Sequence, residues 1–108
     1  MRLLKTDDFS SVFSLRRSIG DAFFQLLVAP NGLPYARLGL VVGRKADKRA
    51  VARNYIKRLT RETFRQNATC LAGLDVVIRA RRTFDRKESV AARAALLGLF
   101  DRAQKWRV

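Results

Sequence analysis

Residues 43–65 concentrate the side chains of this chain that could act on a polyanion. The segment reads GRKADKRAVARNYIKRLTRETFR and holds nine Lys and Arg against one Asp and one Glu, a net charge of +7. Lysine neutralises phosphates, and the planar guanidinium of arginine also matches phosphate oxygens and base edges in pairs of hydrogen bonds. The segment therefore predicts a polyanion-binding site. Its candidate residues are Arg44, Lys45, Lys48, Arg49, Arg53, Asn54, Lys57, Arg58, Arg61 and Arg65.

The other titratable residues form no pattern for acid–base or metal-assisted catalysis. The chain has no histidine, and its nine carboxylates are scattered, with only Asp7 and Asp8 adjacent. That spacing predicts neither a general acid–base pair nor a two-metal carboxylate site. Because no histidine can activate Cys70, we interpret this cysteine as a small, partly buried apolar residue. If the protein takes part in catalysis, we expect the chemistry to reside on another molecule.

Length and charge limit the class of protein. A chain of 108 residues, 48% of them hydrophobic, predicts one domain, 1–108, with its own core. The net charge of +14 favours a nucleic-acid partner, because each neutralised phosphate releases counterions. No apolar run approaches the roughly 20 residues of a membrane span, and the acidic residues Asp7 and Asp8 come too early for a signal peptide. We therefore expect a cytoplasmic protein without membrane contact.

A predicted helix from Arg49 to about Gln66 positions the basic residues. At about 100° per residue, one side of it carries a narrow core stripe. The stripe comprises Ala52, Ile56, Leu59 and Thr63, bordered by Tyr55. The opposite side carries four successive like charges at i,i+4 spacing, which are Arg53, Lys57, Arg61 and Arg65. A merely solvated face normally alternates its signs, since each like-charge pair costs a few tenths of a kcal/mol. We therefore interpret this side as anion-binding.

The remaining segments predict a small sheet with helices. We expect an N-terminal helix at Phe9 and Phe13, followed by strands at 20–29 and 35–43. The turn residues PNGLP at 30–34 lead us to join these two strands in a hairpin. Phe9, Phe13, Phe23 and Phe24 are expected in the core, although some of them could instead line a groove where bases stack.

The C-terminal third predicts one more strand and one more helix. In the strand at 71–82, Leu74, Val76 and Ile78 alternate with Asp75, Val77 and Arg79, which indicates a single buried face. The last helix is expected at 85–106. Its core side would be Val90, Ala91, Ala94 and Leu97, widened by Leu96, Leu99, Phe100 and Ala103. The order α-β-β-α-β-α predicts an α+β sandwich.

The segment RLGLVVGRKADKRAVARNYIKRLTRETFR, residues 37–65, resembles the protein subunit of bacterial ribonuclease P. A strand ending in Gly is followed by two basic residues, a short loop, KRA, and then RN-x-IKRL, RE and F. LLKTDDFSSVF (3–13) and DVVIRAR (75–81) match the first helix and the third strand of that family. The similarity covers nearly the whole chain, with a loose match at the ends of the last helix. The third position of the RNR signature of the family is Tyr55 here, not Arg.

This resemblance implies a fold, an activity and partners. The fold would be a sandwich like domain 2 of ribosomal protein S5, with a left-handed strand–helix–strand crossover against the usual right-handed preference. The activity would be endonucleolytic removal of the 5′ leader from precursor tRNA, catalysed by a large RNA subunit with bound Mg²⁺. The protein would bind that RNA in a 1:1 complex. It would also hold the single-stranded leader in a cleft between the sheet and the first helix.

The resemblance also implies roles for single residues. Arg53 and Asn54 occupy the first two positions of the signature, and the basic positions that follow are Lys57, Arg58 and Arg61. The basic loop before the helix supplies Arg44, Lys45, Lys48 and Arg49. Phe9, Phe13 and Tyr55 are assigned to the leader cleft, where Tyr55 would either stack on a base or sugar or simply pack. Asn54 could share a Mg²⁺ ion with RNA phosphates through its amide oxygen.

Three alternatives stand beside this reading. A ribosomal or RNA-assembly protein would share the composition, and only the pattern at 37–65 argues against it. A helix-turn-helix DNA-binding protein needs two adjacent helices joined by a short turn, whereas the strand-like RLGLVVG precedes the basic helix here. A stand-alone nuclease would need the acid–base residues that this sequence lacks.

Overall fold

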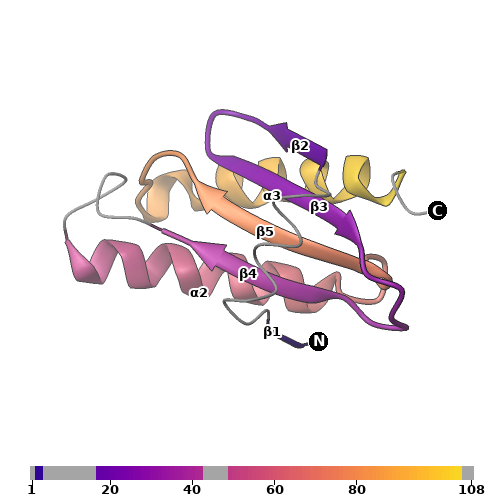
Figure 1. The fold of residues 1–108 in the computed structure, drawn as a ribbon. Coiled ribbons are helices and arrows are strands. Elements are labelled where there is room, and N and C mark those ends of the chain that lie inside the picture. Colours follow the sequence, from indigo (N-terminus) through magenta and orange to yellow (C-terminus); the bar gives the residue numbers. More distant parts are fainter. Residues whose placement is uncertain (1, 4–16, 43–48, 106–108) are drawn as a thin grey trace.

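The computed structural model describes residues 2–3, 17–42 and 49–105. The elements are β1 (Arg2–Leu3), β2 (Arg17–Gly20), β3 (Phe24–Pro30), β4 (Arg37–Val41), α2 (Ala50–Gln66), β5 (Leu74–Ala80), the 3₁₀ turn η1 (Arg86–Glu88) and α3 (Ser89–Gln104) (Figure 1). The helix expected at Phe9 and Phe13 lies outside the described residues, as do Arg44, Lys45 and Lys48. The predicted α+β class is confirmed, and α2 matches the expected central helix to within one residue.

The strands form one mixed sheet in the order β1-β4-β5-β3-β2. The central strand β5 pairs in parallel with β4 and antiparallel with β3. At the outer edge, β2 pairs antiparallel with β3. The turn between β2 and β3 is fixed by Asp21, whose Oδ1 accepts hydrogen bonds from the backbone N–H groups of Phe23 and Phe24, both at 2.9 Å. The unit β4-α2-β5 is thus a parallel crossover, and its left-handed sense stays a prediction.

The hairpin expected between 20–29 and 35–43 is wrong, because β5 lies between β3 and β4. The segment 30–34 does turn the chain, and Asn31 Nδ2 donates to the Tyr35 carbonyl across the turn at 3.2 Å. Gly73, just before β5, accepts a hydrogen bond from the Asn31 N–H at 2.9 Å and donates one to the Tyr35 carbonyl at 3.3 Å. The backbones of both arms therefore also bond to the residue that precedes β5, and this strand lies between β3 and β4.

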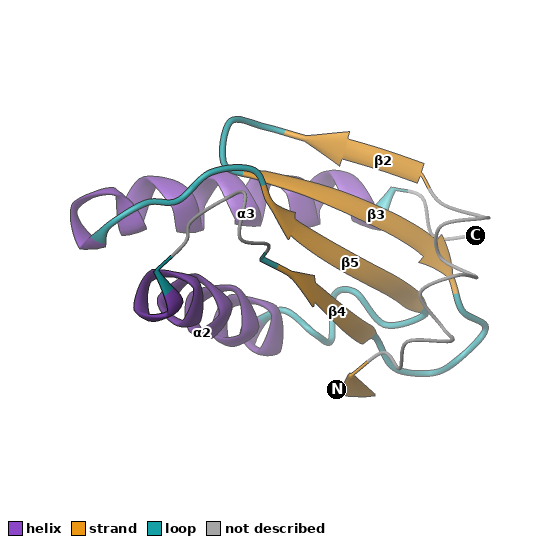
Figure 2. Ribbon diagram, turned by 60° about the vertical axis from the view of Figure 1, so that its left-hand side comes forward, coloured by secondary structure: helices purple, strands orange, loops and turns teal. Residues whose placement is uncertain are grey.

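Helices α2 and α3 cover one face of the sheet, and the main core lies between them and the strands (Figure 2). Phe64 of α2 and Phe100 of α3 meet edge to face, with ring centroids 6.0 Å apart and an interplanar angle of 79°. Of the expected aromatic core residues, Phe24 is fully buried and Phe23 packs against the core from a partly buried position. Thr60 and Thr63 are also buried, and their hydroxyls donate to the carbonyls of Ile56 and Leu59 one turn earlier.

Strand β5 is buried on both of its faces, contrary to the single buried face expected. Val77 is fully buried in a second, smaller cluster with Leu27 and Ala29 on the sheet face that α2 and α3 do not cover. Asp75, on the same side of the strand, is only 4% exposed. A strand whose two faces are both covered is typically a near-continuous buried run. The alternation in the sequence therefore marked the two sheet faces, not a buried and a solvated face.

Helix α3 packs with only part of the stripe that was expected, because Leu96, Leu99, Phe100 and Ala103 are confirmed in the core and the other four predicted residues are not. Its buried residues are Ala92, Leu96, Leu99, Phe100 and Ala103. Val90 and Leu97, placed in the core by the sequence analysis, are 76% and 41% exposed, and Ala91 and Ala94 are exposed as well. The helix has two overlapping apolar sides, and the side with the larger Phe100 removes more apolar area from water. None of the helices in the described ranges is long and apolar enough to cross a membrane.

The connection from α2 to β5, residues 67–73, is a series of tight turns. The N–H groups of Cys70 and Leu71 donate to the carbonyls of Asn67 and Ala68, both at 3.1 Å. Leu71 points into the core and is fully buried, whereas Cys70 is exposed. The expectation of a partly buried Cys70 is therefore wrong, because Leu71 and Ala68, rather than Cys70, pack against the core in this turn.

Candidate nucleic-acid interface

Helix α2 separates its apolar and basic side chains onto different sides. Its buried residues are Ile56, Leu59, Thr60, Thr63 and Phe64. We call the other side the basic face, and its described members are Arg53, Asn54, Lys57, Arg58, Arg61 and Arg65. Arg53 and Lys57 are half-buried, which is common for long side chains with aliphatic stems. The other four residues are exposed, which makes the face accessible to a partner.

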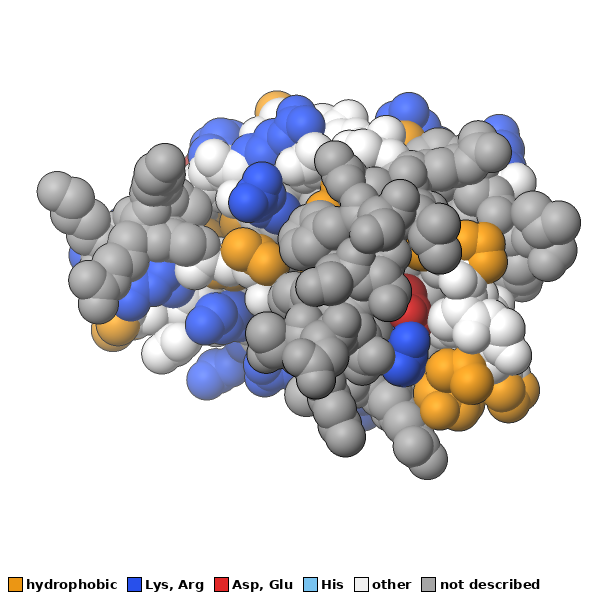
Figure 3. All heavy atoms as spheres, viewed as in Figure 1, with side chains coloured by type: hydrophobic (Ala, Val, Ile, Leu, Met, Phe, Trp, Pro, Cys, Tyr) orange, Lys and Arg blue, Asp and Glu red, His pale blue; other side chains and the backbone are white. Residues whose placement is uncertain are grey.

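The charge of the basic face is not balanced within its own helix. Residues 50–66 carry five Lys and Arg and one carboxylate, Glu62, a net charge of +4 (five minus one). Figure 3 shows several Lys and Arg side chains gathered over the region of α2. Like charges at this density repel one another modestly, and a bound polyanion relieves that repulsion. The face is therefore suited to phosphates.

Tyr55 lies at the border of the core, beside the first turns of α2. Its ring meets the ring of Phe84 edge to face, with centroids 6.2 Å apart and an interplanar angle of 69°. Phe84 is 6% exposed and belongs to the main core, against which Tyr55 also packs. The structure thus brings Tyr55 together with the segment that leads into α3, and not with the smaller cluster on the other sheet face. Its assignment to a leader cleft with Phe9 and Phe13 stays a prediction.

A second group of basic residues, which was not singled out from the sequence, begins in the last residues of β5 and continues into η1. Its exposed members are Arg79, Arg81, Arg82, Arg86 and Lys87. The run RARR at 79–82 and the run DRK at 85–87 could have indicated it, but their grouping depends on how β5 leads into η1. Two of these arginines also make contacts with the turn between β2 and β3. Arg81 Nη1 donates to the Asp21 carbonyl at 3.1 Å, and Arg82 lies 4.3 Å from the centroid of the Phe23 ring.

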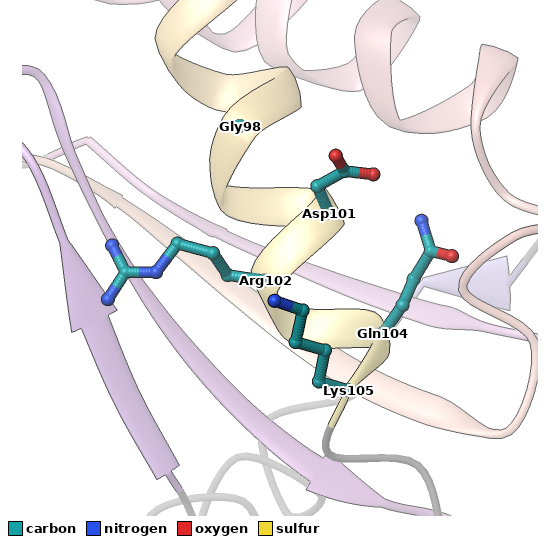
Figure 4. Close-up of a pocket in the computed structure, with 5 residues that line it drawn as sticks. All are labelled: Gly98, Asp101, Arg102, Gln104 and Lys105. Carbon is teal, nitrogen blue, oxygen red and sulfur yellow. The ribbon is translucent and has the colours of Figure 1, made fainter.

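The C-terminal half of α3 carries a pocket of about 430 Å³ that does not extend either basic group. Figure 4 shows Arg102 pointing to the opposite side of the helix from Asp101 and Gln104. Polar groups at a ligand site normally converge on one point. The side chains here diverge and carry both signs of charge, so we assign no site to this pocket.

The described residues do not form a metal site by themselves. Within 2–3, 17–42 and 49–105, no group of three or more His, Cys, Asp or Glu side chains could hold an ion. Asn54 is exposed on α2 and could provide a single amide oxygen. Mg²⁺ requires octahedral oxygen ligands and usually combines few protein groups with water and phosphate oxygens. Asn54 therefore fits a Mg²⁺ ion only if phosphates and water supply the other ligands.

Comparisons with known proteins agree on one family. The family model described as ribonuclease P matches residues 1–104. A ribonuclease P protein component from Chromobacterium violaceum is 56% identical over 106 residues, covering 98% of this chain and 88% of that protein. One from Azoarcus is 45% identical over 101 residues, with coverages of 94% and 84%.

Solved structures give the same result. The ribonuclease P protein from Thermotoga maritima superposes with a TM-score of 0.78 at 35% identity, covering 94% of this chain and 96% of that one. The protein from Staphylococcus aureus gives a TM-score of 0.80 at 27% identity, and the match covers 94% of each chain. The sheet and helices described above are therefore those of this group of proteins.

Proposed function

Because the chain belongs to the ribonuclease P protein family, and is thus a protein component of a tRNA-processing endoribonuclease, we propose that it binds the catalytic RNA subunit through the basic face of α2. The RNA partner and precursor tRNA follow from the family at a general level. Beyond that, we propose which surface binds the RNA, that the RNA rather than the protein carries the catalysis, and that the protein contacts the leader.

The observation that carries the proposal is the separation of side chains on α2. One side of the helix is anchored in the core by Ile56, Leu59 and Phe64, so the opposite side is held rigidly outward. Its exposed arginines, Arg58, Arg61 and Arg65, lie within two turns of one another. Because the helix backbone is already ordered, only the arginine side chains lose freedom when they neutralise successive phosphates of a folded RNA.

Catalysis is proposed to reside on the RNA subunit. The chain contains no histidine, and within its described residues no three His, Cys, Asp or Glu side chains gather where they could hold a metal ion. Mg²⁺ bound mainly by RNA phosphates would supply the metal-assisted hydrolysis of the phosphodiester bond. The residues of this chain would bind and orient the RNA subunit and precursor tRNA. They reduce the repulsion between two polyanions, the RNA subunit and precursor tRNA, and so stabilise their complex.

The single-stranded 5′ leader is proposed to bind this chain as well. The leader would be held while it is cleaved off to give the mature 5′ end of the tRNA, and the reaction would take place in the cytoplasm. Phe9 and Phe13 are the candidates for stacking on leader bases, and a stack of this kind tolerates different sequences because every base has a π-face. The contact with the leader should therefore show little base preference and a steep dependence on salt.

Recovery of the RNA bound to this chain in cells tests the proposal. The tagged protein is purified under mild salt, and the RNA that copurifies is sequenced. We expect a ribonuclease P RNA subunit and precursor tRNA. Enrichment of ribosomal RNA instead would favour a ribosomal or assembly role and would contradict the proposal.

A further inference from the structure

A pocket of about 280 Å³ opens between the first turns of α2 and the segment that leads into α3. Its lining includes Arg49, Val51, Ala52, Tyr55, Phe84 and Arg86. We propose that this pocket receives one unpaired nucleobase of the RNA bound by the basic face, while Arg49 and Arg86 hold the phosphates on either side of it. The inference rests on the proposed function, and it assigns the pocket to a splayed-out nucleotide rather than to a helical stretch of RNA.

The aromatic wall of the pocket is held in place before any ligand arrives. Tyr55 is half-buried and meets Phe84 edge to face at 6.2 Å. Phe84 is in turn packed edge to face against Phe23 at 5.7 Å and Phe24 at 5.8 Å. A tyrosine ring supported in this way is already ordered. Stacking a base on the ring therefore costs little further side-chain entropy.

The mouth of the pocket is apolar as well as aromatic. Val51 is 83% exposed, more than the other exposed large hydrophobic residues of the described part of the chain, Val90 and Leu97. Ala52 beside it is half-buried and adds further apolar surface. An exposed valine on its own needs no explanation. One that borders a supported tyrosine supplies a second contact for the flat face of a base.

The pocket is flanked by positive charge from both of the segments that form it. Arg49 occupies the N-cap position of α2, and Arg86 is the first residue of η1; both are exposed. Arg49 also lies one turn before Arg53, so the pocket continues the basic face at its N-terminal end. An RNA strand whose phosphates follow that face would pass the mouth of the pocket.

Asp85 adds a means of selecting the base. This residue also lines the pocket, and its Oδ1 accepts hydrogen bonds from the N–H groups of Lys87 at 3.0 Å and Glu88 at 3.2 Å, which fixes the carboxylate. Its Oδ2 accepts no hydrogen bond from the described residues. A carboxylate oxygen accepts readily from the exocyclic amino group of cytosine, adenine or guanine. Uracil, with carbonyl oxygens on both sides of its single N–H, should bind less well.

The size of the pocket fits a single base. Sites for drug-sized ligands span about 300–1,000 Å³, and this one lies just below that range. It is therefore too small for a folded RNA element or a peptide helix. The nucleotide that enters it could belong to the RNA subunit or to precursor tRNA, and the experiment below separates the two sources.

Photocrosslinking in the reconstituted complex identifies the nucleotide. A photoreactive group is attached to a cysteine introduced by Val51→Cys in a Cys70→Ser background, and the same group at Arg58→Cys serves as a control on the basic face. We expect both positions to crosslink to RNA, with position 51 marking one discrete unpaired nucleotide. A crosslink to the RNA subunit or to precursor tRNA tells which of them supplies the base.

Removal of that base then tests whether the pocket holds it. Tyr55→Ala should weaken binding of the complete RNA about tenfold, whereas Tyr55→Phe, which keeps the ring, should stay within about twofold of the unaltered protein. On RNA made abasic at the crosslinked nucleotide, the two variants should bind equally. Replacing the base by uracil should also weaken binding, and Asp85→Asn should reduce that discrimination.

The remaining outcomes separate this inference from the proposed function. A crosslink from position 58 without one from position 51 would overturn the pocket and leave the basic face intact. The pocket would likewise be overturned if Tyr55→Ala weakened binding equally for complete and abasic RNA. The base would then make no contribution through Tyr55. If Tyr55→Ala lowers the thermal stability, Arg86→Gln gives a test at an exposed residue, with an expected decrease of about 0.7 in the salt slope. Crosslinks from neither position would contradict the proposed function itself.

Discussion

Arg37 and Asp75 face each other as direct partners in the register of β4 and β5 and form a two-point ion pair. Arg37 Nε donates to Asp75 Oδ1 at 2.8 Å, and Nη2 donates to Oδ2 at 2.6 Å. Asn31 Nδ2 also donates to Oδ1 at 2.9 Å. These bonds explain how a carboxylate only 4% exposed is tolerated in the central strand. They also tie the turn at 30–34 to the strand that separates β3 from β4.

Breaking this pair should destabilise the fold strongly. Asp75→Ala leaves the partly buried Arg37 guanidinium without its carboxylate, and we expect the free energy of unfolding to fall by about 3 kcal/mol. Urea denaturation followed by circular dichroism measures the loss.

The exposed pair of Arg82 and Glu88 provides the control for that measurement. Its side chains are 45% and 42% exposed, and Glu88→Gln should cost less than about 1 kcal/mol. Equal costs for Asp75→Ala and Glu88→Gln would mean that burial does not give the Arg37–Asp75 pair its importance.

The side on which α3 packs can be tested with two truncations. Leu96→Ala removes a fully buried side chain and should lower the free energy of unfolding by about 2–5 kcal/mol. Val90→Ala, at a residue 76% exposed, should change it by no more than about 0.5 kcal/mol. A larger effect at Val90 than at Leu96 would contradict the packing of α3 described here.

The salt dependence of RNA binding tests the basic face. Arg58→Ala combined with Arg61→Ala removes two exposed charges, and log K against log salt should become less steep by about 1.5. Arg93→Ala, an exposed arginine on α3, is the control and should leave the slope nearly unchanged. The slope is obtained from binding curves of the RNA subunit at several salt concentrations. An unchanged slope in the double variant would remove these residues from the phosphate-binding surface.

The elements that depend on local patterns could be predicted from the sequence. Helix α2 has no Gly or Pro and a clear stripe through Ile56 and Leu59, so its limits and its two sides are confirmed by the structure. The pairing of strands is a different matter, because it depends on contacts distant in the sequence. Nothing in PNGLP indicates that Gly73, about 40 residues later, will bond to both arms of that turn.

The same limit applies to the candidate site. The basic residues of α2 follow from helical spacing alone, but the surroundings of Tyr55 do not. Its neighbour Phe84 is 29 residues further along the chain (84 minus 55), and their contact arises from the way η1 leads into α3. The pocket could therefore not be predicted, although each of its residues is visible in the sequence. On α3 the two apolar sides differ little in pattern, and the choice between them depends on how Phe100 fits against Phe64.

Cleavage of precursor tRNA in a reconstituted system tests the central claim most directly. The cleavage rate is measured at low Mg²⁺ with in vitro transcribed RNA subunit, alone and together with this chain or its variant with Arg58→Ala and Arg61→Ala. We predict that the unaltered chain raises the rate of the RNA, that the variant does so only at higher protein concentration, and that the chain alone cleaves nothing. Cleavage by the chain without RNA, or no increase when the two are combined, would contradict the claim that this protein binds and assists a catalytic RNA.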